Sequence, residues 1–172
     1  MSNFVRKSPI GKLLICQEGI FLTGICFTTQ EKLTSLSVIP TKAGIQKQNP
    51  MDPRIRRAIT KQLDAYFAGK LKKFDLPIKL TGTAFQKSVW RALTQIPYGQ
   101  TRSYGEIAKM IKKPRAVRAV GSAVGKNPVG IILPCHRVIR SDGQIGEFAW
   151  GVKIKKQLLK LETDNLQLTR VT

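Results

Sequence analysis

The residue types best suited to covalent chemistry lie side by side in one apolar segment, where Cys135 immediately precedes His136. A cysteine attacks through its thiolate, and an ordinary thiol with a pKa of about 8.5 is only slightly ionised at pH 7. A nearby imidazole that takes up the thiol proton supplies the thiolate, and a carboxylate on its far side orients the imidazole. The pair therefore indicates a nucleophilic cysteine with a histidine base. The alternative is an inert cysteine that packs as a small apolar residue.

The segment around this pair constrains how its two side chains meet. Residues 131–139 are mostly apolar and predict a strand that leads into the pair. Neighbouring side chains of an extended chain point to opposite faces, so Cys135 and His136 need a turn or a bridging water to interact. Cys16 and Cys26 have no histidine or basic neighbour close in sequence, and we expect both in the core. Because His136 is the only histidine, a zinc site with two histidines is excluded, and we expect no metal.

The first half of the chain is predicted to contain short strands. Residues 12–16 and 19–27 are apolar and rich in strand-forming types, with a tight turn at residues 17–19. A third apolar stretch covers residues 33–39, and the polar residues 41–50 predict an exposed loop.

A helix is predicted after this loop. Asp52 suits an N-cap, Pro53 fits the first helical position, and Gly69 suits the end of the helix. Apolar residues recur at every fourth position, at Ile55, Ile59, Leu63 and Phe67. The basic residues between them predict a solvated face, which consists of Arg54, Arg57 and Lys61.

The second half is predicted to be mostly helical. Capping boxes at residues 83–86 and 103–106 begin two helices. A third helix is expected to start at Pro114 with apolar residues over 117–124, and a last one to cover residues 152–162. Two short helices joined by a few residues, the second of them basic, resemble a helix-turn-helix.

Composition and charge limit the classes of function. The chain has 172 residues, of which 42% are hydrophobic, so it can bury a core. Thirty Lys and Arg against ten Asp and Glu give a formal net charge of +20, which points to nucleic acid or an anionic membrane as partner. No run approaches the roughly 20 apolar residues of a membrane span, and the N-terminus does not read as a signal peptide. Three cysteines without close pairing favour a reducing compartment, and we expect a cytoplasmic protein. Basic clusters at residues 112–118 and 153–156 are candidate phosphate contacts.

Residues 134–139, Pro-Cys-His-Arg-Val-Ile, resemble the active-site motif of the methylated-DNA–protein-cysteine methyltransferases, also called O6-alkylguanine-DNA alkyltransferases. Other segments resemble the same family in the same order, namely residues 82–90, 96–104, 118–128 and 158–162. The resemblance covers residues 82–162 nearly continuously, whereas the first part of the chain matches chiefly at residues 8–12.

The resemblance implies a fold and an activity. The expected fold is a ribonuclease-H-like α/β N-terminal domain at residues 1–80, followed by a mostly α, winged helix-turn-helix-like domain at residues 81–172. The family repairs DNA by flipping O6-alkylguanine out of the duplex through the minor groove and transferring the alkyl group irreversibly to a cysteine, here Cys135. The expected protein is thus a single-turnover methyltransferase, a monomer that needs no cofactor. Its partner is double-stranded DNA that contains O6-alkylguanine.

The resemblance also assigns roles to single residues. His136 would deprotonate Cys135 through a water, with Glu162 orienting His136, and Asn127 would hold the turn before the active-site segment. Tyr104 would protonate the departing guanine and help to rotate the phosphate, and Arg118 would insert into the base stack. Further DNA contacts are expected at Ser103, Ala119, Gly121, Ala123, Lys126 and Arg137. The expected substrate pocket consists of Val138, Phe148, Ala149 and Trp150. On the residues alone, Tyr104 also fits plain packing, Arg118 a phosphate contact, and Glu162 a surface charge.

One segment departs from the family pattern. Phe148-Ala149-Trp150-Gly151 stands where many members have a Tyr-Ser-Gly-Gly-like loop, so two hydroxyls are lost and the pocket wall gains bulk. This departure predicts that methyl groups are accepted and that benzyl-type groups react poorly. Two other functions remain as alternatives: a DNA-binding protein that senses alkylated bases without transferring the group, and a cysteine hydrolase built on Cys135 and His136.

Overall fold

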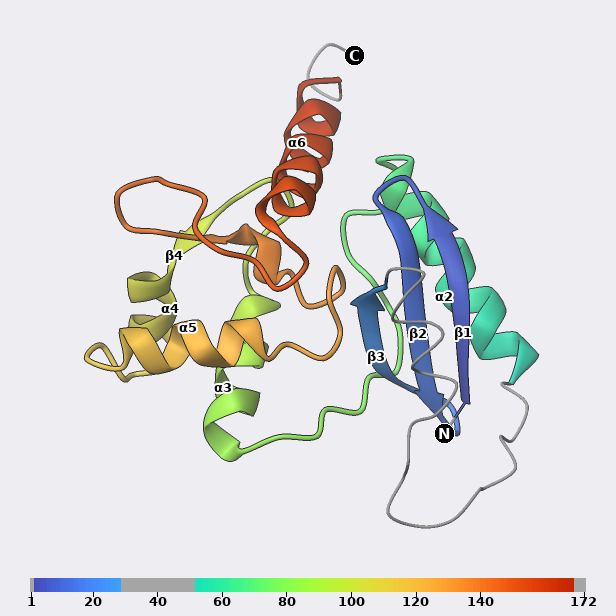
Figure 1. Cartoon of the computed structure of the whole chain (residues 1–172), viewed down its shortest axis with the longest axis horizontal. Helices are drawn as coiled ribbons and strands as arrows, with labels where there is room; N and C mark the ends of the chain where they lie inside the picture. The colour runs from blue at the N-terminus through green and yellow to red at the C-terminus, as the bar shows by residue number, and fades with distance from the viewer. Residues whose placement is uncertain (1, 29–51, 169–172) are drawn as a thin grey trace.

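We describe a computed structural model of the chain, shown in Figure 1, in which residues 2–28 and 52–168 are described. An antiparallel sheet of order β1-β2-β3 forms the first part, from β1 (Ser2–Ser8), β2 (Gly11–Glu18) and β3 (Phe21–Phe27). The predicted stretch 33–39 and loop 41–50 lie outside the described residues. Strand β1 was not predicted, because it is an edge strand whose side chains alternate between half-buried and exposed, without a buried apolar face.

Helix α2 (Pro53–Phe67) packs against the sheet and closes the first part of the core. Its start is as predicted, because the Asp52 side chain accepts a hydrogen bond from the Arg54 amide at 2.8 Å. The positive φ of Gly69, +71°, ends the helix in the left-handed region that glycine enters without strain. Leu13 and Ile15 of the sheet are fully buried, as are Ile59 and Leu63 of α2. The two ends of the predicted apolar stripe, Ile55 and Phe67, are half-buried against the core. The predicted basic face of the helix is exposed at Arg54, Arg57 and Lys61.

The second part of the chain is mostly helical, with α3 (Ala84–Leu93), α4 (Tyr104–Met110), α5 (Val117–Gly125) and α6 (Val152–Leu168). A short parallel pair, β4 (Arg102–Ser103) and β5 (Val138–Ile139), lies beside α4. Both predicted capping boxes are formed, at Thr83 and at Ser103. This combination of an α/β first part and a helical second part confirms the predicted fold class.

Two local predictions in this part are wrong. Helix α5 begins at Val117 and not at Pro114, because Lys112 leaves the helical region with φ +59° and the next residues form a turn. Residues 131–139 do not form one strand. They fold into tight turns closed by hydrogen bonds from the Ile132 amide to the Gly130 carbonyl at 2.9 Å and from the Cys135 amide to the Leu133 carbonyl at 2.8 Å.

A 3₁₀ helix follows these turns at Cys135–Arg137, and only β5 is extended. Pro134 fixes its own φ at −80° and has no amide proton to donate, which favours the turn that leads into Cys135.

The sheet and the helical part are joined beside this segment. The Ile25 amide of β3 donates to the Pro128 carbonyl at 2.9 Å, and the Gly130 amide donates to the Ile25 carbonyl at 3.1 Å. Through these bonds the outer edge of the sheet holds the residues that lead into Cys135. One cluster of buried apolar residues includes members of both parts.

Candidate active site

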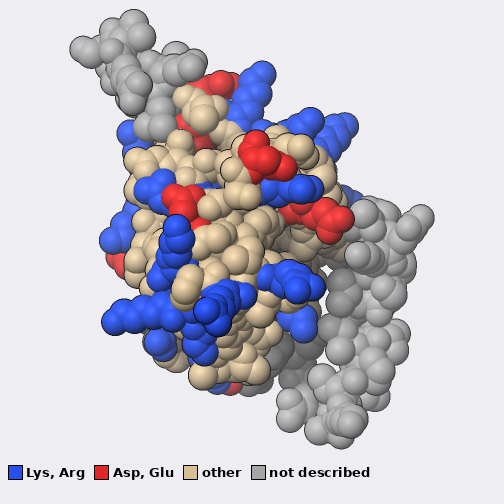
Figure 2. All heavy atoms as spheres, turned by 90° about the vertical axis from the view of Figure 1, so that its left-hand side faces the viewer, with Lys and Arg blue, Asp and Glu red and all other residues tan. Residues whose placement is uncertain are grey.

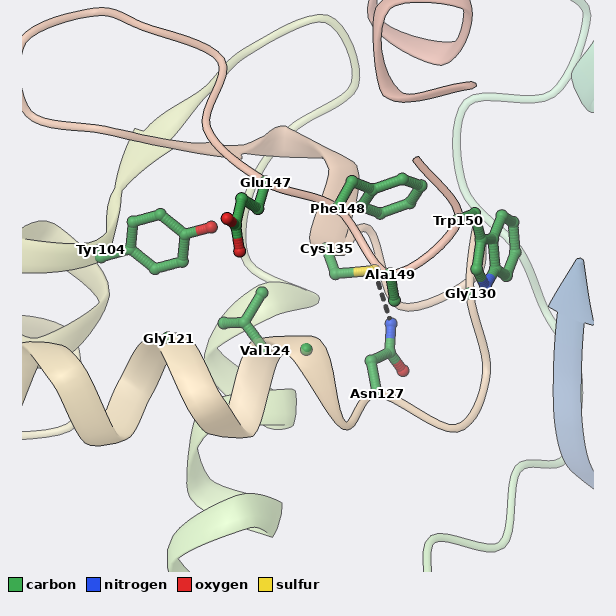
Figure 3. Close-up of a pocket in the computed structure, with 11 residues that line it drawn as sticks. Tyr104, Gly121, Val124, Asn127, Gly130, Cys135, Glu147, Phe148, Ala149 and Trp150 are labelled. Atoms are coloured by element: carbon green, nitrogen blue, oxygen red, sulfur yellow. Dashed lines mark hydrogen bonds between the residues drawn. The ribbon is translucent and has the colours of Figure 1, made fainter. Parts of the chain in front are cut away.

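Cys135 lies at the wall of a cavity of about 400 Å³ between α5, the 3₁₀ helix and the loop before α6. Figure 3 shows the side chains around it. The cavity is lined by Tyr104, Gly121, Val124, Gly125, Asn127, Gly130, Cys135, Glu147, Phe148, Ala149 and Trp150. Seven of the residues expected at the site therefore meet in one cavity although they are up to 46 positions apart in the sequence.

The thiol of Cys135 is 7% exposed and is held by Asn127. The Asn127 Nδ2 atom donates to Sγ at 3.0 Å and to the Leu133 carbonyl at 2.8 Å, while its Oδ1 accepts from the Val129 amide at 3.0 Å. Asn127 thus fixes the turn and supplies a donor that stabilises a thiolate. Burial nevertheless raises the pKa of Cys135 above its usual value, against the opposing hydrogen bond from Asn127. The resting thiol is protonated, and attack requires a base.

His136 is fully buried, and its Nε2 lies 2.8 Å from Glu162 Oε1. Burial lowers the pKa of His136, although the Glu162 hydrogen bond and charge oppose this shift. A neutral imidazole beside an ionised carboxylate donates through Nε2 and therefore presents a lone pair at Nδ1. Among the residues that the structure describes, none is hydrogen-bonded to this Nδ1. The ring is accordingly arranged as a base whose free nitrogen can take up a proton.

Glu162 is a buried carboxylate that accepts hydrogen bonds from several elements. Arg137 donates from Nε and Nη2, each at 2.9 Å, and the Tyr66 hydroxyl donates at 2.8 Å. The Gly99 amide donates at 3.0 Å. Burial alone would raise the pKa of Glu162, but the hydrogen bonds and charges of His136 and Arg137 outweigh it and lower the pKa to about 2. The carboxylate is therefore ionised at neutral pH and fixes the orientation of His136.

The position of Arg137 corrects the expectation that it contacts DNA. Its side chain is 6% exposed, and its remaining donor, Nη1, is taken by the Ile96 carbonyl at 2.7 Å. Two further expectations need the same correction. Ala123 is buried against α3, where its carbonyl accepts from Trp90 Nε1 at 2.9 Å, so it offers no DNA contact. Val138 is fully buried in β5 and does not line the cavity.

The other expected DNA contacts lie on or near α5. Arg118, Ala119 and Lys126 are exposed, Gly121 lines the cavity, and Ser103 is half-buried as the N-cap of α4. Figure 2 views the molecule from the side of α4 and α5, and basic side chains stand out across that face. Exposed basic residues on these helices and their connection are Lys109, Lys112, Lys113, Arg115 and Arg118.

Tyr104 is half-buried and its hydroxyl points into the cavity. The ring lies between α5 and the loop before α6, because a Cβ added at Gly121 would lie 3.9 Å from Tyr104 Cδ1 and one at Gly146 would lie 4.0 Å from Cε2. Burial raises the pKa of Tyr104, and the nearby Cys135 and Glu147 act in the same direction. The phenol therefore keeps its proton and is available as a donor.

Several residues of the site were missed from the sequence. Lys155 was placed in a phosphate-binding cluster, yet it is 0% exposed and its Nζ donates to the carbonyls of Val138 at 2.6 Å, Ile145 and Glu147. Burial lowers the pKa of Lys155 to about 8. The helical spacing that places Lys155 with Leu158 and Glu162 on one buried face was the available signal. Tyr66 gave no local signal, because it lies 96 positions from Glu162 in the sequence.

Gly130 was also missed, and it explains how Trp150 fits. A Cβ at Gly130 would lie 2.2 Å from Trp150 Cζ2, so the indole packs directly on the backbone there. Trp150 also meets Phe148 edge to face, with ring centroids 5.6 Å apart. The two rings form a bulky wall beside Cys135 (Figure 3).

The described residues hold no group of three or more metal-ligating side chains. Within the same residues, no helix combines the length and the apolar character needed to cross a bilayer.

Comparisons with known proteins agree over both parts of the chain. Residues 84–164 match the family model described as 6-O-methylguanine DNA methyltransferase, DNA binding domain, and residues 4–80 match its ribonuclease-like domain. A methylated-DNA–protein-cysteine methyltransferase from Methanosarcina barkeri is 60% identical over 95% of this chain and 98% of its own length. One from Methanosarcina mazei is 46% identical over 97% of this chain and 100% of its own. The crystal structure of Mycobacterium tuberculosis OGT in complex with DNA superposes with a TM-score of 0.81 at 41% identity, covering 96% of this chain and 94% of that one.

Proposed function

Because the chain belongs to the family of methylated-DNA–protein-cysteine methyltransferases, we propose that it repairs O6-methylguanine in double-stranded DNA by moving the methyl group to its own Cys135. The arrangement that carries this proposal is the thiol of Cys135 in a cavity, with Asn127 donating to Sγ and the buried pair of His136 and Glu162 behind it. Each molecule reacts once, because the thioether product does not regenerate the thiol.

The reaction begins with removal of the thiol proton. His136 takes it up at Nδ1 through a bridging water, and the ionised Glu162 stabilises the resulting imidazolium. The thiolate attacks the methyl carbon, an S–C bond forms and the O6–C bond breaks, so the electron pair leaves with the guanine. Tyr104 donates its proton to the ring of the departing base, which stabilises the leaving group. The products are S-methylcysteine and an unmodified guanine in the DNA.

Access to the cavity requires that the damaged nucleotide leaves the duplex. Flipping costs a few kcal/mol, and an alkylated pair reduces that cost because it is already weakened. We assign Arg118, exposed on α5, to fill the space that the base vacates. Phosphate contacts come from the exposed basic residues around α4 and α5. This binding through the minor groove carries little sequence preference.

The proposal also covers the compartment, the oligomeric state, the need for a cofactor and the domain boundaries. We place the protein in the cytoplasm as a monomer that works without a cofactor. We divide it into residues 1–80 and residues 81–172, a division that the two family-model ranges support. A DNA-binding protein that only senses alkylated bases is not favoured, because Cys135 is present and lies in the cavity. A cysteine hydrolase would leave the basic face unexplained.

The test is to mix the protein with a duplex that carries one O6-methylguanine and to record its intact mass and that of the Cys135 peptide. We expect a gain of one methyl group on Cys135 that saturates at one per protein and is absent in Cys135→Ser. Tight binding without a mass gain would favour the damage-sensing alternative, and continuous turnover would favour a hydrolase.

A further inference from the structure

One charged side chain of the cavity takes no part in the chemistry described above. Glu147 lines the cavity together with Tyr104 and Cys135. Within the described part of the chain, its carboxylate forms neither a salt bridge nor a hydrogen bond. DNA phosphates repel such a carboxylate, so an unpaired acid at a DNA-facing cavity weakens binding unless the substrate offers it a donor.

The geometry places this acid next to the proton donor of the site. In Figure 3 the hydroxyl of Tyr104 and the carboxylate of Glu147 point toward one another on the same side of the cavity. The loop that carries Glu147 lies beside the Tyr104 ring, since Lys155 Nζ donates to the Glu147 carbonyl at 3.4 Å and a Cβ added at Gly146 would lie 4.0 Å from Tyr104 Cε2. A donor and an acceptor are therefore presented side by side to whatever base enters.

This pair complements one edge of the damaged base. The minor-groove edge of guanine presents the N3 acceptor beside the N2 amino donor. Alkylation at O6 removes the proton from N1, so the amino group is the only N–H donor that the base retains. If Tyr104 donates to the ring nitrogen, the neighbouring carboxylate of Glu147 meets the amino group. O4-alkylthymine has only acceptors on its corresponding edge and would direct O2 toward the carboxylate.

We propose that Glu147 accepts a hydrogen bond from the exocyclic amino group of flipped O6-alkylguanine and thereby favours this substrate over O4-alkylthymine. The inference rests on the proposed function, since it specifies what the same cavity selects. Glu147 is then a specificity-determining residue. A site built to bind a substrate N–H rejects an analogue that lacks it, because its polar group is left unpaired.

The experiment uses the full chain in excess over three duplexes that differ at one base: O6-methylguanine, O6-methylhypoxanthine, which lacks only the amino group, and O4-methylthymine. Single-turnover rate constants are measured for the unaltered protein and for Glu147→Ala. The matched control is Asp142→Asn, which removes a negative charge from the same loop, where Asp142 is exposed and pairs with Arg140. Comparing substrates within one preparation cancels any loss of folded protein. Glu147→Gln, similar in size to the native residue, gives the same comparison if the alanine variant does not fold.

We expect the unaltered protein to react about tenfold or more faster with O6-methylguanine than with O6-methylhypoxanthine, as for a hydrogen bond to a charged group. This ratio should fall to within about twofold in Glu147→Ala and stay unchanged in Asp142→Asn. The rate on O4-methylthymine, relative to O6-methylguanine, should rise in Glu147→Ala. If the ratio of the rate constants on O6-methylguanine and O6-methylhypoxanthine were the same in the unaltered protein and in Glu147→Ala, the inference would be overturned. It would also be overturned if Glu147→Ala slowed transfer equally on all three substrates, because that result would indicate a proton-transfer role beside Tyr104. Absence of transfer from all three duplexes by the unaltered protein would instead overturn the proposed function.

Discussion

Replacing Glu162 by Gln removes the charge that holds Arg137 and His136 in the core. The pKa of Glu162 is lowered from 4.5 to about 2 in the folded protein. At about 1.4 kcal/mol per pKa unit, this difference corresponds to about 3 kcal/mol of stability at neutral pH. The loss from one partner of a buried ion pair is of the same size, about 3–5 kcal/mol, because the other charge is left unpaired. We therefore expect Glu162→Gln to lower the free energy of unfolding by about 3 kcal/mol.

The assay is urea unfolding at pH 7, followed by the same measurement toward acid pH. Because the folded pKa is depressed, the contribution of Glu162 is fully present above pH 4.5 and is lost as the pH falls toward about 2. The curves of the two proteins should therefore converge over that range. The double variant Arg137→Met with Glu162→Gln should recover part of the loss, since no unpaired guanidinium remains. Asp142→Asn, at an exposed pair, should change stability by less than about 0.5 kcal/mol. A loss below about 1 kcal/mol in Glu162→Gln, or a double variant weaker than the single one, would refute the reasoning.

Three further outcomes follow from the site. Gly130→Ala places a Cβ 2.2 Å from Trp150 Cζ2, so we expect a lower melting temperature and slower transfer, with partial recovery when Trp150→Ala is added; an unchanged melting temperature would contradict the packing. Trp150→Gly opens the cavity wall, and the rate on O6-benzylguanine relative to O6-methylguanine should rise at least about tenfold. Comparable rates on both substrates in the unaltered protein would show that the wall does not discriminate between methyl and benzyl groups. Because burial lowers the pKa of His136 below 6.5, the single-turnover rate at saturating DNA should stay level from pH 8 to pH 6.5 and decline only at lower pH; a decline that starts above pH 7 would contradict a neutral base.

The features that could be predicted from the sequence alone are those that depend on neighbouring residues, above all the starts of helices. The capping boxes at Thr83 and Ser103 and the N-cap at Asp52 were predictable, because each depends on residues within one helical turn. Among the seven expected residues that meet in the cavity, Cys135 was indicated by its own type and its histidine neighbour, whereas the other six came from the family resemblance and not from periodicity. Their roles in transfer remain predictions.

The failures have physical causes of a different kind. The turns before Cys135 contain apolar residues that suit a strand, and only hydrogen bonds to β3 and within the segment decide their shape. Arg137 and Lys155 are cations that ordinarily indicate a surface, but each is buried against a specific partner from a distant segment. Nothing in the local sequence around Glu147 indicates a role in the site. Its carboxylate faces Tyr104 only because the loop before α6 folds back over the cavity.

The hydrogen bonds of Ile25 with Pro128 and Gly130 have a consequence for biosynthesis. Strand β3 leaves the ribosome about a hundred residues before the segment that binds Ile25, so the amide and carbonyl of Ile25 lack these two partners throughout that interval. Closing so long a loop slows folding, since its entropy cost precedes the contacts that offset it. A fragment that stops before residue 128 should therefore aggregate. The buried hydrogen bond from Tyr66 to Glu162 likewise makes the first part of the chain depend on a residue that is synthesised much later. Because these contacts join the two parts, we expect them to unfold in a single transition even though they are distinct in architecture.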